Sequence, residues 1–140
     1  MMHARPFQPH LSEGLSLEAR LHAELCRLHE LCDGLQGATV ATNDGLALCT
    51  LGSLLADTTA ATAAFLVDEL NTHLGVLRVG RAHEVAVWTD AGPWYMARIN
   101  SLPYVIALFA GPTVPVALLR HAGALAASRL APTLASLTQT

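Results

Sequence analysis

A predicted β-hairpin between two predicted helices constrains the fold more than any other part of this sequence. Residues 37–49 read Gly-Ala-Thr-Val-Ala-Thr-Asn-Asp-Gly-Leu-Ala-Leu-Cys, so apolar strand-forming runs flank the Asp44-Gly45 pair. An Asp-Gly pair tolerates the positive φ angles that a tight hairpin turn requires. Taken with the helices and strands predicted on either side, the hairpin gives the order helix, two strands, helix, three strands, helix. This order predicts an α+β domain.

The first helix is predicted to begin near Leu15, with Ser16 as its N-cap, and to end at Gly34. Residues 1–14 contain two prolines and no apolar periodicity, so we expect a flexible N-terminal arm followed by a single domain over 15–140. The apolar positions of the helix recur at helical spacing: Leu17, Leu21, Leu25, Leu28 and Leu31.

A middle helix is predicted over Asp57–Leu74, because the residues at its start offer N-cap oxygens and Gly75 supplies a stop. Its first two turns are crowded with alanine. Small side chains allow another backbone to approach closely, so this helix could pack on a second copy of itself as well as on its own sheet. Alanine is also the best helix former, which explains the same composition without any partner.

The second half of the chain predicts three strands and a last helix. Strands are expected over 83–89 and 94–100, and the wholly apolar run 104–110 is expected at the centre of the sheet, covered on both faces. Val76 to Arg81 is read as a loop. In the last helix Pro132 should cause a kink or a stop, and the apolar stripe is Leu119, Ala122, Ala126 and Leu130.

Composition excludes several classes of function. Hydrophobic residues make up 52% of the chain against 14% charged, which favours apolar surface left over for self-association. A formal charge of -3 offers no cationic surface for nucleic acid or an anionic membrane. All eight basic residues are arginine, so the chain lacks the lysine of a P-loop GTPase. Three cysteines and no secretory segment predict a reduced cytoplasmic protein, and no apolar run is long enough to span a bilayer.

Candidate chemical sites are few. On the first predicted helix, spacings of four, three and four place a set of metal-ligand residue types on one stripe, but one straight helix cannot bring four ligands around a tetrahedral ion. No catalytic constellation is visible, so we expect a binding protein with no catalytic residue, metal or cofactor rather than an enzyme. The metal-ligand stripe consists of His22, Cys26, His29 and Asp33.

Two further groups of residues have both a structural and a functional interpretation. Trp88, Trp94 and Tyr95 flank one turn, where they can pack across strands in the core or form an aromatic anchor at a protein interface. Arg78 and Arg81 invite comparison with an arginine finger, which stabilises phosphoryl-transfer charge in trans. Ordinary solvated loop arginines are the simpler interpretation of this second pair.

The order of elements resembles the roadblock family, which is named for dynein light chains and includes bacterial regulators of Ras-like GTPases. The resemblance is carried by 37–46, by the helix over 57–74 and by the strand over 85–89, and it covers about residues 16–137. It implies a five-stranded antiparallel sheet of the profilin-like type flanked by three helices, with the middle helix on one face. No catalytic residue transfers from the family motif.

The resemblance also implies an obligate homodimer, joined through the middle helix and the third strand so that one sheet continues across both copies. Members of the family regulate or scaffold a Ras-like small GTPase, and some accelerate its GTP hydrolysis without supplying an arginine finger. The residues expected in the dimer interface are Ala60, Ala61, Ala64, Phe65, Val85, Val87 and Thr89. The residues expected to meet the GTPase lie one turn apart on the middle helix: Ala64, Asp68 and Thr72.

Two alternatives to GTPase regulation remain open at this point. One is a structural or adaptor dimer that binds its partner regardless of nucleotide state. The other is a small-molecule sensor with a pocket between helix and sheet, because profilin-like sheets also occur in sensory domains. A shared fold does not by itself decide between these functions.

Overall fold

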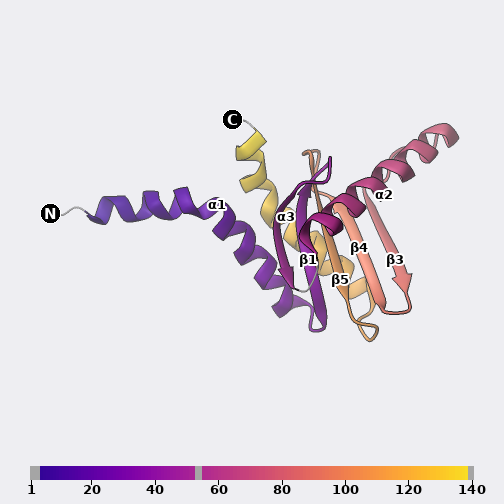
Figure 1. Cartoon of the computed structure of the whole chain (residues 1–140), viewed down its shortest axis with the longest axis horizontal. Helices are drawn as coiled ribbons and strands as arrows, with labels where there is room; N and C mark the ends of the chain where they lie inside the picture. Colours follow the sequence, from indigo (N-terminus) through magenta and orange to yellow (C-terminus); the bar gives the residue numbers. More distant parts are fainter. Residues whose placement is uncertain (1–3, 53–54, 139–140) are drawn as a thin grey trace.

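Three helices cover the two faces of one antiparallel sheet (Figure 1). In this computed structural model, the described residues are 4–52 and 55–138. The helices are α1 (Ala4–Leu31), α2 (Ala56–Leu77) and α3 (Val116–Thr138). The strands are β1 (Leu35–Thr42), β2 (Ala47–Gly52), β3 (Glu84–Thr89), β4 (Gly92–Arg98) and β5 (Tyr104–Ala110). The predicted element order and α+β class are therefore confirmed.

The sheet has the strand order β2-β1-β5-β4-β3, so β2 and β3 form its two edges. The apolar run 104–110 forms β5 at the centre, as predicted, and it pairs with β1 on one side and β4 on the other. The hairpin turn closes as the Asp-Gly pair requires: Gly45 has φ 95°, and its N–H donates to the carbonyl of Thr42 over 3.0 Å.

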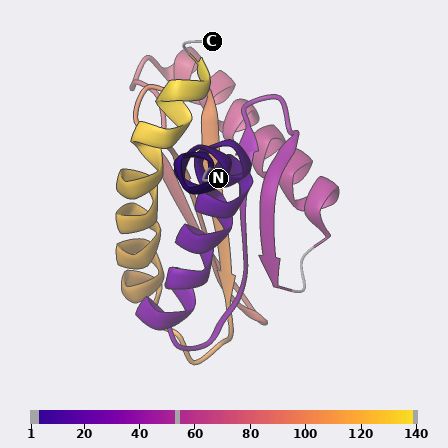
Figure 2. The same ribbon diagram turned by 90° about the vertical axis from the view of Figure 1, so that its left-hand side faces the viewer.

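Helices α1 and α3 lie side by side on one face of the sheet, and α2 lies on the other (Figure 2). The larger core fills the α1/α3 face. There Leu25 and Leu28 of α1 meet Leu119 and Leu130 of α3 over Ile106, and all five side chains are fully buried. On the α2 face the core is thin, because small residues bring the helix backbone close to the sheet: Ala60 packs with Ala41 and Val105, and Ala63 with Met96 and Ala107.

Each of the three helices differs from the sequence prediction at one or both of its ends. Helix α1 begins at Ala4 and not near Leu15, so residues 4–14 are helical where a flexible arm was expected, and residues 1–3 lie outside the described part. Pro6 falls in the first helical turn, where a missing N–H costs little. The N-terminal part of α1 projects away from the sheet (Figure 1).

Helix α2 continues through Gly75 to Leu77, so the predicted stop and part of the predicted loop were wrong. Arg78 ends the helix instead, in the left-handed region with φ 58°. The predicted N-cap residues do not cap α2 either, because the N-cap is Leu55, which makes no side-chain cap bond.

Pro132 lies inside α3, which runs on to Thr138, so Pro132 does not stop the helix. Packing outweighs the local proline cost here, because Leu134 beyond it is fully buried. The predicted apolar stripe of α3 is confirmed, since all four of its residues are buried.

Candidate protein interface

Exposed apolar side chains gather on the outer part of α2 and on β3. Phe65 is 62% exposed, Leu66 44% and Val87 39%. Several large apolar side chains exposed on neighbouring elements are typical of an interaction surface. We call these three residues the apolar patch.

A groove of about 200 Å³ lies beside this patch, between α2 and the β3–β4 hairpin. Leu66 and Val87 line it together with Trp94, whose ring packs on Phe109 with a centroid distance of 4.9 Å. Cross-strand pairing explains the position of Val87, because it lies opposite Trp94 in the register of β3 and β4. The groove walls are apolar side chains and the methyl groups of threonine: Thr62, Ala63, Leu66, Val87, Thr89, Trp94 and Met96.

Strand β3 beside the groove forms an edge of the sheet and pairs only with β4 among the described strands. The strand alternates between the two faces. Val85, Val87 and Thr89 lie on the α2 face, because they stand opposite or beside residues that face α2, whereas Glu84, Ala86 and Trp88 lie on the α3 face. An unpaired edge next to an exposed apolar groove offers both main-chain and side-chain contacts to another strand.

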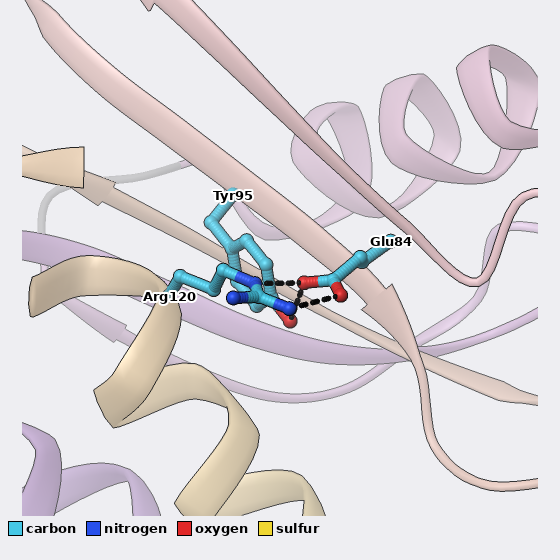
Figure 3. A network of polar contacts seen from close by, with 3 residues as sticks. All are labelled: Glu84, Tyr95 and Arg120. Carbon is cyan, nitrogen blue, oxygen red and sulfur yellow. Dashed lines mark hydrogen bonds and ion pairs between the residues drawn. The ribbon is translucent and has the colours of Figure 1, made fainter. Parts of the chain in front are cut away.

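An ion pair holds this edge strand to α3 from the opposite face (Figure 3). The Nε of Arg120 donates to Oε1 of Glu84 over 2.6 Å, and Nη2 donates to Oε2 over 2.8 Å. The Tyr95 hydroxyl donates to Oε1 of the same carboxylate over 3.0 Å. We call Glu84, Tyr95 and Arg120 the clamp, because a bidentate guanidinium–carboxylate pair fixes orientation as well as distance.

The clamp shifts the pKa values of Glu84 and Tyr95 in opposite directions. The hydrogen bond from Arg120 keeps the pKa of Glu84 below its ordinary value, and the bond from Tyr95 adds to this. Burial raises the pKa of Tyr95, and its hydrogen bond to the Glu84 carboxylate raises it further. At neutral pH the carboxylate is therefore ionised and the tyrosine is neutral, which is the arrangement that the hydrogen bonds require.

The residues predicted for the dimer interface divide between the surface and the interior. Ala61, Phe65, Val87 and Thr89 are exposed, and Val85 is half-buried. Ala60 and Ala64 are instead buried within the chain, on the inner side of α2. The helix turns these two alanines toward its own sheet, so they are not on the exposed surface of α2.

The residues predicted to contact a GTPase also differ in exposure. Asp68 and Thr72 are exposed on α2, and the Thr72 hydroxyl donates back to the Asp68 carbonyl over 3.1 Å. Ala64 is buried on the inner side of α2, so it is not exposed with Asp68 and Thr72.

The three aromatic residues near the β3–β4 turn do not form one cluster. Trp94 lies on the α2 face, Tyr95 is buried on the α3 face, and Trp88 is 70% exposed. Period-two alternation separates neighbours such as Trp94 and Tyr95 onto opposite faces. Among the described residues, no group of His, Cys, Asp and Glu is arranged to hold a metal ion. In the same part of the chain, no helix combines the length and apolarity needed to cross a membrane.

Sequence reasoning missed the Glu84–Arg120 pair of the clamp and four members of the groove, Thr62, Ala63, Leu66 and Met96. Glu84 and Arg120 are 36 residues apart, so no local pattern links them. Trp94 was considered as an interface anchor, whereas Leu66 lies on a helix whose exposed side the sequence did not identify. Only the pairing register shows that they meet Val87.

Comparison with known proteins finds similarity in structure but not in sequence. No protein-family model and no curated protein matches the sequence. A roadblock/LC7 domain from Streptomyces avermitilis superposes with a TM-score of 0.71 at 22% identity, covering 80% of this chain and 95% of that domain. An MglB structure with a tetrameric arrangement gives 0.78 at 18% identity, covering 86% and 92% of the two chains. The gliding protein MglB from Thermus thermophilus gives 0.76 at 18% identity, covering 86% and 93%.

Proposed function

This chain has the roadblock/LC7 fold, and on that premise we propose that it is a homodimeric regulator or scaffold of a Ras-like small GTPase in the cytoplasm. The observation that carries the proposal is the apolar patch beside the open edge of β3. The neighbours share this fold, and one of them is described in a tetrameric arrangement, which supports self-association. The family resemblance supplies the GTPase as the class of partner.

In the proposed dimer, β3 of one copy pairs with β3 of the other, and the two α2 helices lie side by side over the joined sheets. A two-fold axis makes such an interface self-complementary. Burying Phe65 or Leu66 against the second copy contributes about 1.5–3 kcal/mol per fully covered side chain. The clamp keeps β3 in place before the partner arrives, so less ordering is needed at association.

The GTPase is proposed to bind the outer surface of α2 that carries Asp68 and Thr72. With no catalytic residue of its own, the dimer acts on hydrolysis by repositioning residues of the GTPase. Such a regulator binds the GTP form in preference to the GDP form. Binding that ignores the nucleotide indicates an adaptor dimer instead.

Val87→Arg tests the dimer. It places a charge where the proposed interface buries an apolar side chain, and burial of an unpaired charge is very costly. We expect the wild type to sediment as a dimer and the variant to be monomeric. Leu118→Arg is the matched control, because Leu118 on α3 is 36% exposed and lies outside the proposed interface. A dimeric Val87→Arg variant, or equal dissociation of both variants, contradicts the interface.

Single-turnover GTP hydrolysis tests the GTPase proposal. A Ras-like GTPase from the same cell is loaded with GTP or GDP and mixed with the dimer, and binding and hydrolysis are followed together. We expect tighter binding of the GTP form, with or without faster hydrolysis, and loss of binding with Asp68→Arg. Absence of binding in both nucleotide states refutes this function.

A further inference from the structure

A second, polar cavity lies between α2 and the end of the sheet opposite the β3–β4 turn. Its volume is about 80 Å³, much smaller than a pocket for a nucleotide or a drug-sized ligand. Two arginines, two asparagines and one aspartate supply its polar lining, and none of them belongs to the groove described above. Its lining residues are Asn43, Ala64, Val67, Asp68, Asn71, Arg81, Arg98 and Val105.

The fold fixes both arginines at this cavity. Arg98 comes two residues after Met96 on β4, and therefore lies on the α2 face, where Met96 packs against Ala63. Arg81 comes from the connection between α2 and β3. Hydrogen bonds anchor that connection directly after Arg81, since the Ala82 N–H donates to Asn71 Oδ1 over 2.6 Å and the Arg98 N–H donates to the His83 carbonyl over 2.9 Å.

The charge of the two guanidinium groups is not balanced within the described part of the chain. The ion pairs found there involve Arg27, His73 and Arg120, so neither Arg81 nor Arg98 has a carboxylate within 4.0 Å. Asp68 also lines the cavity but joins neither arginine in an ion pair. Two guanidinium groups and one carboxylate give the cavity a net charge of +1 when all three are ionised.

We propose that this cavity receives a single carboxylate group, the side chain of an aspartate or glutamate on a partner protein. A guanidinium presents parallel N–H donors that match the two oxygens of a carboxylate. The net charge of +1 suits a monoanion, and the Asp68 carboxylate disfavours a phosphate dianion. A free ion of this size makes too few contacts to bind tightly, so the group arrives on a larger molecule that also covers α2.

The proposal rests on the proposed function in one respect, because the partner tested first is the Ras-like GTPase and Asp68 belongs to both surfaces. The acidic side chain would enter beside the exposed surface of α2 and fix the orientation of the partner. Charged contacts of this kind contribute specificity and association rate more than affinity.

The first experiment uses the protein alone and acetate as the probe. Arginine side-chain N–H signals are followed by nuclear magnetic resonance in sodium acetate, sodium phosphate and sodium chloride at equal ionic strength. We expect acetate to shift the Arg81 and Arg98 signals in a saturable way, with phosphate weaker and chloride without saturation. Equal effects of acetate and chloride, or tighter binding of phosphate, overturn the carboxylate assignment.

Arginine variants distinguish acetate binding in the cavity from a general effect of the positive charge of the protein. Arg81→Gln and Arg98→Gln should each weaken acetate binding by about tenfold or more, because each removes one charged donor group. Arg81 is exposed, so its variant keeps the test valid if Arg98→Gln fails to fold. Arg129→Gln, on the exposed surface of α3, should leave acetate binding unchanged. Equal weakening by all three variants contradicts a specific site.

The second experiment measures association of the dimer with the GTPase. Arg81→Gln should slow association and weaken binding by about tenfold, while Arg129→Gln should not. Normal GTPase binding by Arg81→Gln refutes the docking role. If the wild type binds acetate at these arginines but binds no GTPase, the proposed function fails while the carboxylate site stands.

Discussion

Arg120 on α3 holds both carboxylate oxygens of Glu84 on the edge strand β3, at 2.6 Å and 2.8 Å. The pair links a helix on one face of the sheet to the strand that borders the proposed dimer interface. Side chains in the pair remain partly exposed, at 62% for Arg120 and 38% for Glu84, so solvent weakens their attraction. Their geometric effect on β3 is therefore more important than their energy.

Acid should loosen this link. The pKa of Glu84 is lower in the folded chain than its ordinary value of 4.5, so its contribution to stability is complete above that value and is lost as pH falls through the folded pKa. Thermal unfolding between neutral pH and pH values below the ordinary pKa should show a loss that is smaller in Glu84→Gln. The same acid dependence in both proteins would show that Glu84 makes no contribution.

Alkali should act through Tyr95. Its pKa is raised in the folded chain above the ordinary value of 10.0, so its contribution is complete below that value and is lost as pH rises toward the folded pKa. The absorbance change of tyrosinate follows this directly. The chain has two tyrosines, so Tyr104→Phe leaves Tyr95 alone, and its signal should appear above pH 10.0 in the folded protein and near 10.0 after denaturation.

Gly75 of α2 and Gly123 of α3 predict stability changes of opposite sign. Nothing lies within 4 Å of a Cβ built at Gly75, so Gly75→Ala should stabilise the chain by about 0.5–1 kcal/mol through better helix propensity. A Cβ at Gly123 would lie 2.6 Å from the Tyr95 ring, so Gly123→Ala should destabilise it by about 1–3 kcal/mol. Urea unfolding of both variants checks the prediction, and changes of the same sign would contradict it.

The same Leu→Ala change at a buried and at a partly exposed position of α3 measures the effect of burial on stability. Leu130 is fully buried, so Leu130→Ala should lower the free energy of unfolding by about 2–5 kcal/mol through loss of transfer energy and creation of a cavity. Leu118→Ala makes the same change on the same helix, where the side chain is 36% exposed. Its effect in urea unfolding should be well below that of Leu130→Ala. Equal losses would contradict the difference in burial, because alanine is the better helix former and helix propensity cannot cause a loss at either position.

The sequence was sufficient for the fold because periodicity and turn chemistry act over short distances. The Asp44-Gly45 turn predicted the hairpin, and the wholly apolar run predicted β5 at the centre of the sheet. Helix ends were less predictable. Gly75 lies inside α2 and Pro132 lies inside α3, and at Pro132 the burial of Leu134 outweighs the local preference against proline.

The candidate interface was only partly predictable, because its residues depend on which way each element turns. Alanine composition indicated that α2 packs closely, but not that Ala60 and Ala64 face the sheet while Phe65 faces out. The clamp and the arginine cavity join residues from distant parts of the chain. Only a register between strands and a packing angle between helix and sheet bring such residues together.

Which edge strands pair between copies also determines whether the assembly is closed or continues to grow. If β3 pairs with β3 of a second copy, both copies present only β2 at the outer ends of the joined sheet. Pairing β3 with β2 would instead leave one unused edge of each kind and allow polymerisation into a fibre. The register of β2 with β1 shifts at Val40/Ala41, which discourages further addition at that edge, whereas the register of β3 with β4 is continuous. The choice between a closed particle and an open polymer therefore depends on the difference between two edges of one sheet.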